Sequence, residues 1–276
     1  MYKVRKRIGS VISVILKLIV SFIFIFPFLW MLSVSLQSDA ETQSMSLTLI
    51  PKIPQFQNYV NAWNSAPFPL YIRNSLLVIA GIVILQMLIM VPAAYAFAKM
   101  EFKGKNILFG IILIAFMMPI QIRFIPIYFM MSDWNLMDTL WPQILPHMTD
   151  AFGIFLLRQY FMQVPDELIE AAKLDKSTDL QIMWKIMLPM SRPGVASVIL
   201  LSFVGHWNDY FWPLVMTNSD SVRPITIGVA SLKATEGSLF WNTIMAGNMF
   251  LVIPVLIIYF LMARNIIKSF TYTGIK

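Results

Sequence analysis

The sequence PDELIEAAKLDK occupies residues 165–176, and the polar segment that it opens closes with IMLP at residues 186–189. Apolar stretches of membrane-spanning length lie on both sides of this segment, at about 139–157 and 193–216. A helix that crosses a bilayer needs about 20 predominantly apolar residues. We therefore expect a membrane protein that presents this polar segment as a loop at the membrane surface.

The composition of the whole chain also indicates a membrane protein. Of its 276 residues, 58% are hydrophobic and 13% are charged, and the mean hydropathy is +0.71. A soluble globular domain carries about 25% charged residues, so one aqueous core could not bury this much apolar surface. The absence of cysteine excludes disulfides, thiolate metal sites and a catalytic thiol. The net charge of +7 fits basic membrane edges, and no nucleic-acid partner is expected.

Six apolar stretches are the candidate spans of a single membrane domain covering residues 1–276. They lie at about 11–36, 74–98, 106–130, 139–157, 193–216 and 239–263. The first follows a basic N-terminus but is too long for the core of a signal peptide, so we interpret it as an uncleaved span. Every span contains proline, which indicates either ordinary kinks or irregular helices around a pathway.

The distribution of basic residues predicts the orientation. Lys and Arg are frequent at the N-terminus, near residue 100, in the loop of residues 158–192 and in the C-terminal segment, but sparse in segments 37–73 and 217–238. Cytoplasmic loops of membrane proteins are enriched in these residues. We therefore expect a multi-pass protein of the cell (inner) membrane with both termini and the 158–192 loop in the cytoplasm.

The loop itself predicts two short helices joined by a turn near residues 173–177. Pro165 suits the start of the first helix, and TDLQ at residues 178–181 is a capping box that begins the second. Side chains at helical spacing predict one apolar face on the second helix: Leu180, Met183, Trp184 and Met187. Such a helix pair fits either a groove on another protein or the lipid surface.

The spacing of Glu170-Ala171-Ala172, Ile186 and Leu188-Pro189 resembles the EAA loop of ABC importer permeases. The resemblance extends over almost the whole chain, and within the carbohydrate-uptake branch the MalG-like permease subunits fit best. The supporting segments are YAFAK at 95–99, Pro119 with IP at 125–126, FLLRQYF at 155–161, and WNDY at 207–210 followed by Pro213. The resemblance implies an all-α fold of six transmembrane helices, with a cytoplasmic helix-turn-helix coupling loop between helices 4 and 5.

The resemblance also implies a function and partners. The chain would be one permease half of a heteromeric ABC importer that translocates a carbohydrate, an oligosaccharide. It would work with a second, MalF-like permease, two ATPase subunits and an extracytoplasmic sugar-binding protein. The sequence contains no G-x-x-x-x-G-K-[ST] phosphate-binding loop, so we expect a transport subunit and not an enzyme, with ATP and Mg bound by the partner ATPase and no cofactor here. The residues expected to couple to the ATPase are Glu170, Ala171, Ala172, Asp175, Leu188 and Pro189.

Two features depart from the family pattern. The family loop usually carries glycine just after the aspartate, but Lys176 follows Asp175 here. A turn with positive φ tolerates lysine poorly, so we expect the turn geometry to differ from that of the family. In the family that this chain resembles, the C-terminal tail reaches into the ATPase dimer and commonly carries glycines. Ser269 and Thr273 stand at those positions here, so the resemblance supports a tail contact with the ATPase less strongly than it supports the loop contact.

Polar residues inside the spans are candidates for a transport pathway, because they are costly in a membrane. Gln143, His147 and Asp150 have the i, i+4, i+7 spacing of one helical face, and His206 precedes Trp207-Asn208-Asp209 in the fifth span. Carboxylates and amides hydrogen-bond sugar hydroxyls, and aromatic rings pack on pyranose rings. The candidate pathway residues are Gln121, Gln143, His147, Asp150, Trp207, Asn208 and Asp209. No catalytic residue or metal site is expected.

Other interpretations of these residues remain open. The polar side chains could serve only as hydrogen bonds between helices. Arg123 could contact an anion if the solute were a glycerol-phosphate, and a polyol is a further alternative. His147, Asp150 and Asp209 could also form the proton relay of an ion-coupled transporter. In MalG-like subunits the segment corresponding to residues 217–238 contacts the binding protein, although it could be an idle loop.

Overall fold

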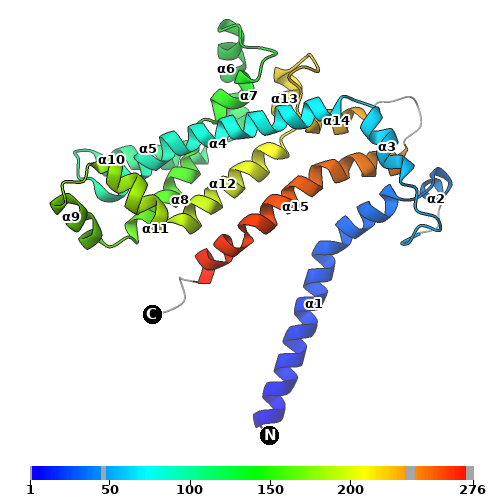
Figure 1. Cartoon of the computed structure of the whole chain (residues 1–276), viewed down its shortest axis with the longest axis horizontal. Helices are drawn as coiled ribbons and strands as arrows, with labels where there is room; N and C mark the ends of the chain where they lie inside the picture. Colours follow the sequence, from blue (N-terminus) through cyan, green and yellow to red (C-terminus); the bar gives the residue numbers. More distant parts are fainter. Residues whose placement is uncertain (1, 45–47, 234–239, 272–276) are drawn as a thin grey trace. The chain divides into compact units, whose positions relative to one another are not determined.

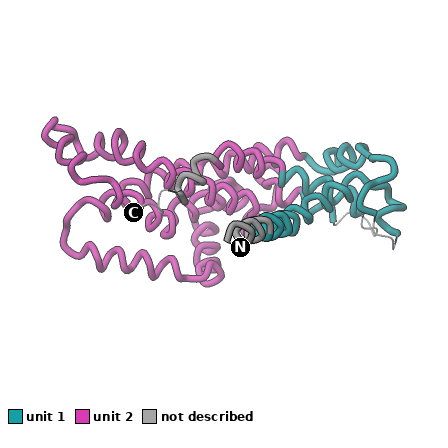
Figure 2. The backbone as a smooth tube through the Cα atoms, turned by 90° about the horizontal axis from the view of Figure 1, so that it is seen from below, with its two compact units in different colours: residues 1–67, 229–252 teal, residues 68–228, 253–276 magenta. Residues whose placement is uncertain are grey.

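The computed structural model describes residues 2–44, 48–233 and 240–271, with side chains described from residue 12 to residue 263 of these ranges. Every regular element in the described residues is a helix (Figure 1), so the predicted all-α class is confirmed. Contacts divide the chain into two compact units, residues 1–67 with 229–252 and residues 68–228 with 253–276 (Figure 2).

Three described helices are long and apolar enough to cross a bilayer over Ile12–Ser35, Phe68–Lys99 and Trp241–Ala263. They belong to α1 (Tyr2–Ser35), α4 (Phe68–Lys99) and α15 (Trp241–Thr271). Each contains one proline, at Pro27, Pro92 and Pro254. The C-terminal tail continues α15 as far as Thr271, and Thr273 lies outside the described residues.

The third predicted stretch, 106–130, forms two helices instead of one. Helices α5 (Lys105–Met117) and α6 (Ile120–Asp133) meet at an angle of 95°. Pro119 caps α6, and Met118 before it is extended, with φ −74° and ψ 120°. A residue before proline is disfavoured in the helical region, which explains the break. A second bent pair joins Asp179–Met190 to Arg192–Trp207 at 83°, and the number of spanning helices rises to five if each pair is one span.

The fourth predicted stretch, 139–157, is also interrupted. It contains α7 (Trp141–Ile144), the 3₁₀ turn η1 (Leu145–His147) and α8 (Ala151–Met162). Asp150 is extended, with φ −136° and ψ 124°, and its carboxylate accepts the N–H of Gly153 at 2.9 Å as the N-cap of α8. The prediction that Gln143, His147 and Asp150 share one helical face is therefore wrong, because the helix ends between His147 and Asp150.

The core of the second unit is a layer of helices around α4. Helix α8 packs along α4, and α12 (Arg192–Trp207) packs against both. The buried side chains at this contact include Met90, Ala94, Leu157 and Phe161. Four short helices form the segment between α8 and α12: α9 (Asp166–Leu174), α10 (Asp179–Ile182), the π-helical turn η2 (Met183–Met187) and α11 (Leu188–Met190).

Hydrogen bonds from two buried asparagine side chains hold the segments of the first unit together. It contains α2 (Asp39–Gln43), α3 (Gln57–Asn64) and the first part of α15. The side chain of Asn58 donates to the carbonyls of Ser35 and Gln37 at 3.0 and 2.8 Å, and Asn242 donates to the Gln37 carbonyl at 3.1 Å and to Asp39 at 2.8 Å. These hydrogen bonds tie α3 and the start of α15 to residues 35–39.

Asp138 holds the segment that follows α13 (Phe211–Met216). Its Oδ1 accepts the backbone N–H groups of Asn218 and Ser219, both at 2.8 Å, and its own N–H donates to the Met216 carbonyl at 3.1 Å. The backbone of Asp138 is left-handed, with φ 56°. The donated hydrogen bonds, first that of Ser219 and then that of Asn218, hold the pKa of the Asp138 carboxyl below its ordinary value of 3.8.

We expect Asp138→Ala to loosen this segment by about 2 kcal/mol, because two hydrogen bonds to a charged group are lost. Amide hydrogen exchange at Asn218 and Ser219 measures the change. Because the native pKa is lowered, the stabilisation is complete above pH 3.8 and is lost as the pH falls through the lower native pKa. Asp138→Asn is the matched control, since asparagine tolerates the left-handed backbone and keeps an acceptor. Unchanged exchange in Asp138→Ala would contradict this role.

Candidate functional site

The 158–192 loop packs against the C-terminal end of α4. Its buried side chains join the same hydrophobic core as α4, and they include Ile169, Ala172, Ile182 and Met187. The predicted capping box is confirmed, because Gln181 N donates to Thr178 Oγ1 at 3.3 Å and Thr178 N donates to Gln181 Oε1 at 3.0 Å. The loop is thus a packed extension of the helical core.

Polar contacts reinforce this attachment. Lys99 Nζ lies 2.6 Å from both the Val164 carbonyl and Asp166 Oδ1, and the Lys99 side chain is almost fully buried. The Tyr95 hydroxyl donates to Asp179 Oδ1 at 3.0 Å. Arg158 Nε donates to the Phe97 carbonyl at 3.0 Å. The last turns of α4 therefore bind both helices of the loop, and a force on the loop reaches α4 directly.

The apolar face predicted for the second helix is partly wrong. Met183 and Met187 are buried, but Leu180 and Trp184 are 63% and 40% exposed, and Ile182 is fully buried in their place. The buried face of this segment is rotated from the predicted one toward Ile182, because Ile182, Met183 and Met187 pack into the hydrophobic core shared with α4. The exposed Leu180 and Trp184 leave apolar surface on the outside of the loop.

The backbone at Lys176 has the left-handed conformation that glycine favours. The expectation that lysine would change the geometry of this turn is therefore wrong. Lys176 has φ 57°, its N–H donates to the Lys173 carbonyl at 3.0 Å, and Ser177 N donates to the Ala172 carbonyl at 2.9 Å. These two bonds form a Schellman motif at the end of α9. Lysine occupies the left-handed position because the hydrogen bonds of the turn impose it, at a cost of about 1–2 kcal/mol.

The residues predicted to couple to an ATPase divide into two groups. Glu170, Ala171, Asp175 and Pro189 are exposed and available to another protein. Ala172 is 8% exposed and Leu188 is half-buried, and both pack against the hydrophobic core. Beside the exposed group, Leu174 at the end of α9 is 84% exposed.

A polar cavity of about 420 Å³ lies where α6, α8, α12 and the interruption around Asp150 meet. Among the predicted pathway residues, His147, Asp150 and Asp209 line it, and Arg123 lines it as well. The remaining lining includes Gln86, Ser202 and His206, which were not in the predicted set. Gln86 is a polar residue inside an apolar stretch, so the rule that selected the others could have found it.

The other predicted pathway residues do not line this cavity, although Gln143 lines a smaller pocket with His147, His206 and Asp209. Gln143 is buried, and its Nε2 donates to the Val222 carbonyl at 3.0 Å. Trp207 is buried and stacks on Phe203, with ring centroids 5.5 Å apart. Asn208 is exposed and donates to the Val204 carbonyl at 2.8 Å, and Gln121 is exposed on α6. Gln143 therefore binds α7 to the segment that follows α13, whereas the stacking of Trp207 on Phe203 lies within α12.

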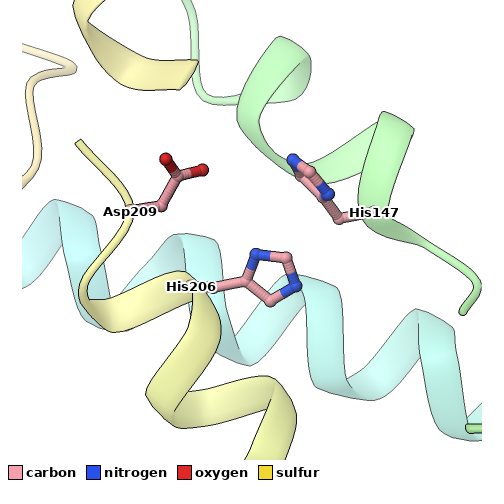
Figure 3. Close-up of side chains that lie close together, drawn as sticks. All are labelled: His147, His206 and Asp209. Atoms are coloured by element: carbon pink, nitrogen blue, oxygen red, sulfur yellow. The ribbon is translucent and has the colours of Figure 1, made fainter. Parts of the chain in front are cut away.

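The two histidines and Asp209 form a cluster at one end of the cavity (Figure 3). The rings of His147 and His206 have centroids 4.5 Å apart, and Trp212 packs against His147 at 5.1 Å. The carbonyl of His147 accepts Gln86 Nε2 at 2.9 Å. Asp209 accepts the Trp212 N–H at 3.3 Å. Neighbouring side chains thus fix the backbone on both sides of the cluster.

Comparison with known proteins identifies the family. Residues 90–272 match the model of the binding-protein-dependent transport system inner membrane component. The chain belongs to this family. It is therefore a multi-pass membrane permease, a transport protein, and the resemblance drawn from the spacing of the EAA loop is confirmed.

Relatives that match more than four-fifths of the permease are named for the transport of different solutes. The permease is 32% identical to an sn-glycerol-3-phosphate transport system permease of Yersinia pestis, over 84% of this chain and 85% of the relative. It is 31% identical to a diacetylchitobiose uptake permease of Streptomyces coelicolor, over 94% and 87%. It is 30% identical to an arabinooligosaccharide permease of Halalkalibacterium halodurans, over 93% of each chain.

Solved structures agree with the fold. A bacterial ABC transporter involved in import of the acidic polysaccharide alginate contains a chain that matches with a TM-score of 0.82, at 24% identity over 94% of the permease and 96% of that chain. A chain of the alginate transporter in complex with a pentasaccharide-bound periplasmic protein matches at 0.65, with 16% identity over 95% of each. At these identities the comparison shows that the permease has the ABC importer fold.

We expect Lys176→Gly to stabilise the loop by about 0.5–1 kcal/mol, because relief of the left-handed strain exceeds the entropy gained by the unfolded chain. Slower hydrogen exchange at the Ser177 amide, which donates to Ala172, would show this. Lys173→Gly inside α9 is the control and should accelerate exchange, since glycine costs about 1 kcal/mol in a helix. Faster hydrogen exchange at the Ser177 amide in Lys176→Gly would show that the lysine backbone is not strained.

Proposed function

We propose that this permease forms one half of the translocation pathway of an ABC importer and carries an oligosaccharide across the membrane. The observation that supports this most is the 420 Å³ cavity between helices, lined by Gln86, Arg123, Asp150 and Asp209. These side chains donate and accept hydrogen bonds of the kind that sugar hydroxyls need. Relatives named for diacetylchitobiose and arabinooligosaccharide uptake, which the permease matches along more than nine-tenths of its length, support the same substrate class.

The family and the loop support the remaining parts of the transporter. In this proposal a second permease completes the pathway, two ATPase subunits bind ATP and Mg beneath it, and a binding protein delivers the sugar from outside. The termini and the 158–192 loop face the cytoplasm. A solved alginate transporter includes a periplasmic protein carrying an oligosaccharide, which favours delivery by such a protein.

The coupling route follows from the contacts of the loop. Glu170, Ala171, Leu174 and Asp175 present an exposed surface to the ATPase. Lys99 binds the start of α9 through Val164 and Asp166. Movement of an ATPase cleft that holds α9 would then pull α4, and α4 carries Gln86 at the cavity. This route gives a rigid connection between the ATPase surface and the pathway.

A glycerol-phosphate is the second candidate, because a relative at 32% identity is named for sn-glycerol-3-phosphate and Arg123 lines the cavity. Asp150 and Asp209 line the same cavity, however. Two carboxylates beside one guanidinium disfavour the binding of a phosphate dianion. The neutral hydroxyl groups of a sugar can instead hydrogen-bond to all three side chains. Competition of radiolabelled oligosaccharide uptake by sn-glycerol-3-phosphate separates the two candidates.

Glu170→Ala and Ala171→Trp should each reduce co-purification of the ATPase about tenfold or more, as expected for central residues of an interface. Both residues are exposed, so the fold of the loop should survive. Ala172→Trp is unsuitable because Ala172 is buried in the core. Lys103→Ala, an exposed change outside the loop, is the control. Undiminished co-purification of both variants would remove the coupling assignment.

Asp150→Asn should lower oligosaccharide uptake about tenfold, because a hydrogen bond to a charged group exceeds a neutral one by about 1–1.5 kcal/mol. Asparagine is a good N-cap, so α8 stays capped, whereas Asp150→Ala would also lose the cap at a cost of about 1 kcal/mol. Complex assembly in detergent should be retained. Asp133→Asn, at the exposed end of α6, is the control. Wild-type uptake in Asp150→Asn would exclude a substrate contact.

A further inference from the structure

Three side chains with metal-ligating atoms converge beside the cavity. His147 lies in η1, His206 lies in the last turn of α12, and Asp209 lies in the break before α13. One ligand atom from each side chain lies within 4.8 Å of the other two. Figure 3 shows the two imidazoles and the carboxylate around one shared space. Convergence from separate segments is a product of the fold and could not be read from their spacing.

We infer that His147, His206 and Asp209 form a binding site for a divalent first-row transition metal ion such as Zn²⁺. Two imidazole nitrogens and one carboxylate oxygen are a donor set that suits this ion, with ligand distances of about 2.0–2.2 Å. Ligand atoms around a tetrahedral ion at these distances are separated by about 3.4 Å. The observed spacing of up to 4.8 Å therefore needs a closure of up to about 1.4 Å, which side-chain rotations can supply.

An independent observation also points to a ligand. His147 Nε2 is buried and has no hydrogen-bond partner among the described residues. A buried nitrogen without a partner costs about 1–3 kcal/mol, and a metal ion would remove this cost. Gln86 Nε2 holds the His147 carbonyl, and Trp212 packs against the His147 ring while its backbone N–H donates to Asp209. The nitrogen is thus kept in place for a ligand.

The charges around the cluster favour a cation. Asp209 belongs to the cluster, and Asp150 lines the same cavity. Arg123 is the opposing charge among the described residues of the cavity lining, so the carboxylates outnumber the guanidinium. Asp209 is held by the Trp212 N–H at one oxygen, and its own carbonyl accepts Thr226 Oγ1 at 2.7 Å. The Thr226 bond fixes the backbone of Asp209, so its carboxylate is held beside the two imidazoles.

A bound ion would join the two segments that border the cavity. It would connect η1 to the break between α12 and α13, and its fourth position would face the 420 Å³ cavity. A pathway that alternates between two open states changes shape around its binding site, and a bridge between two bordering segments would oppose that change. Zn²⁺ therefore holds the cavity in one conformation and inhibits transport reversibly, and a chelator restores it.

The test uses the purified full-length chain without a polyhistidine tag, titrated with Zn²⁺ in a calorimeter and with Co²⁺ by visible absorption. We expect one saturable site and an intense Co²⁺ band from tetrahedral coordination. His147→Gln, His206→Gln and Asp209→Asn should each weaken Zn²⁺ binding at least about tenfold, as even loss of an outer-shell partner can. The Co²⁺ band should disappear in each variant.

Asp150→Asn is the matched control, because it removes the other carboxylate of the same cavity without removing a ligand. Loss of this nearby negative charge should weaken Zn²⁺ binding less than about fivefold, clearly less than loss of a ligand. Equal Zn²⁺ affinity in the wild type and the three ligand variants, or no Co²⁺ band in the wild type, would overturn the site. Zn²⁺ binding is measured without a sugar present, so its result does not depend on whether the oligosaccharide proposal is correct. Zn²⁺ inhibition of uptake that persists in His206→Gln would refute the transport effect.

Discussion

The structure depends on one constraint: backbone polar groups inside an apolar environment must find hydrogen-bond partners within the protein. A continuous helix satisfies most of these groups by itself, as α1, α4 and α15 do apart from the turn at each interior proline. The chain instead interrupts its helices near Pro119, around Asp150 and after Trp207. Side chains supply some of the missing bonds: Asp150 caps α8, Gln86 binds the His147 carbonyl, and Trp212 Nε1 binds the Pro142 carbonyl at 2.7 Å.

The same interruptions create the polar cavity. Polar side chains gather there because irregular backbone needs them, and once there they can also bind a solute. Gln86 illustrates both roles, since it holds the His147 carbonyl and lines the cavity. In the proposed pathway such a residue would serve both packing and transport, so conservative substitutions that keep the hydrogen bond are more informative than removal of the side chain.

The far end of the molecule follows a different principle, which is rigid attachment. The 158–192 loop shares a hydrophobic core with α4, and Lys99 and Tyr95 bind its two helices. A loop held in this way transmits force with little loss, whereas a flexible linker would absorb it. The strained backbone at Lys176 fits this view, because the Schellman bonds are kept despite the unfavourable residue.

The sequence by itself determined the all-α class, the membrane character, the two-helix loop with its capping box at Thr178 and the family, because apolar length, capping and motif spacing are local properties. It also selected His147, Asp150 and Asp209 by the cost of polar groups in a membrane. It misplaced the face shared by Gln143 and Asp150 and the exposure of Leu180, because a helix break and the side of a helix that is buried both depend on packing partners distant in sequence. Only the tertiary structure decided that Gln86 and His206 join the cavity, since the contact between α4 and α12 sets which side chains meet.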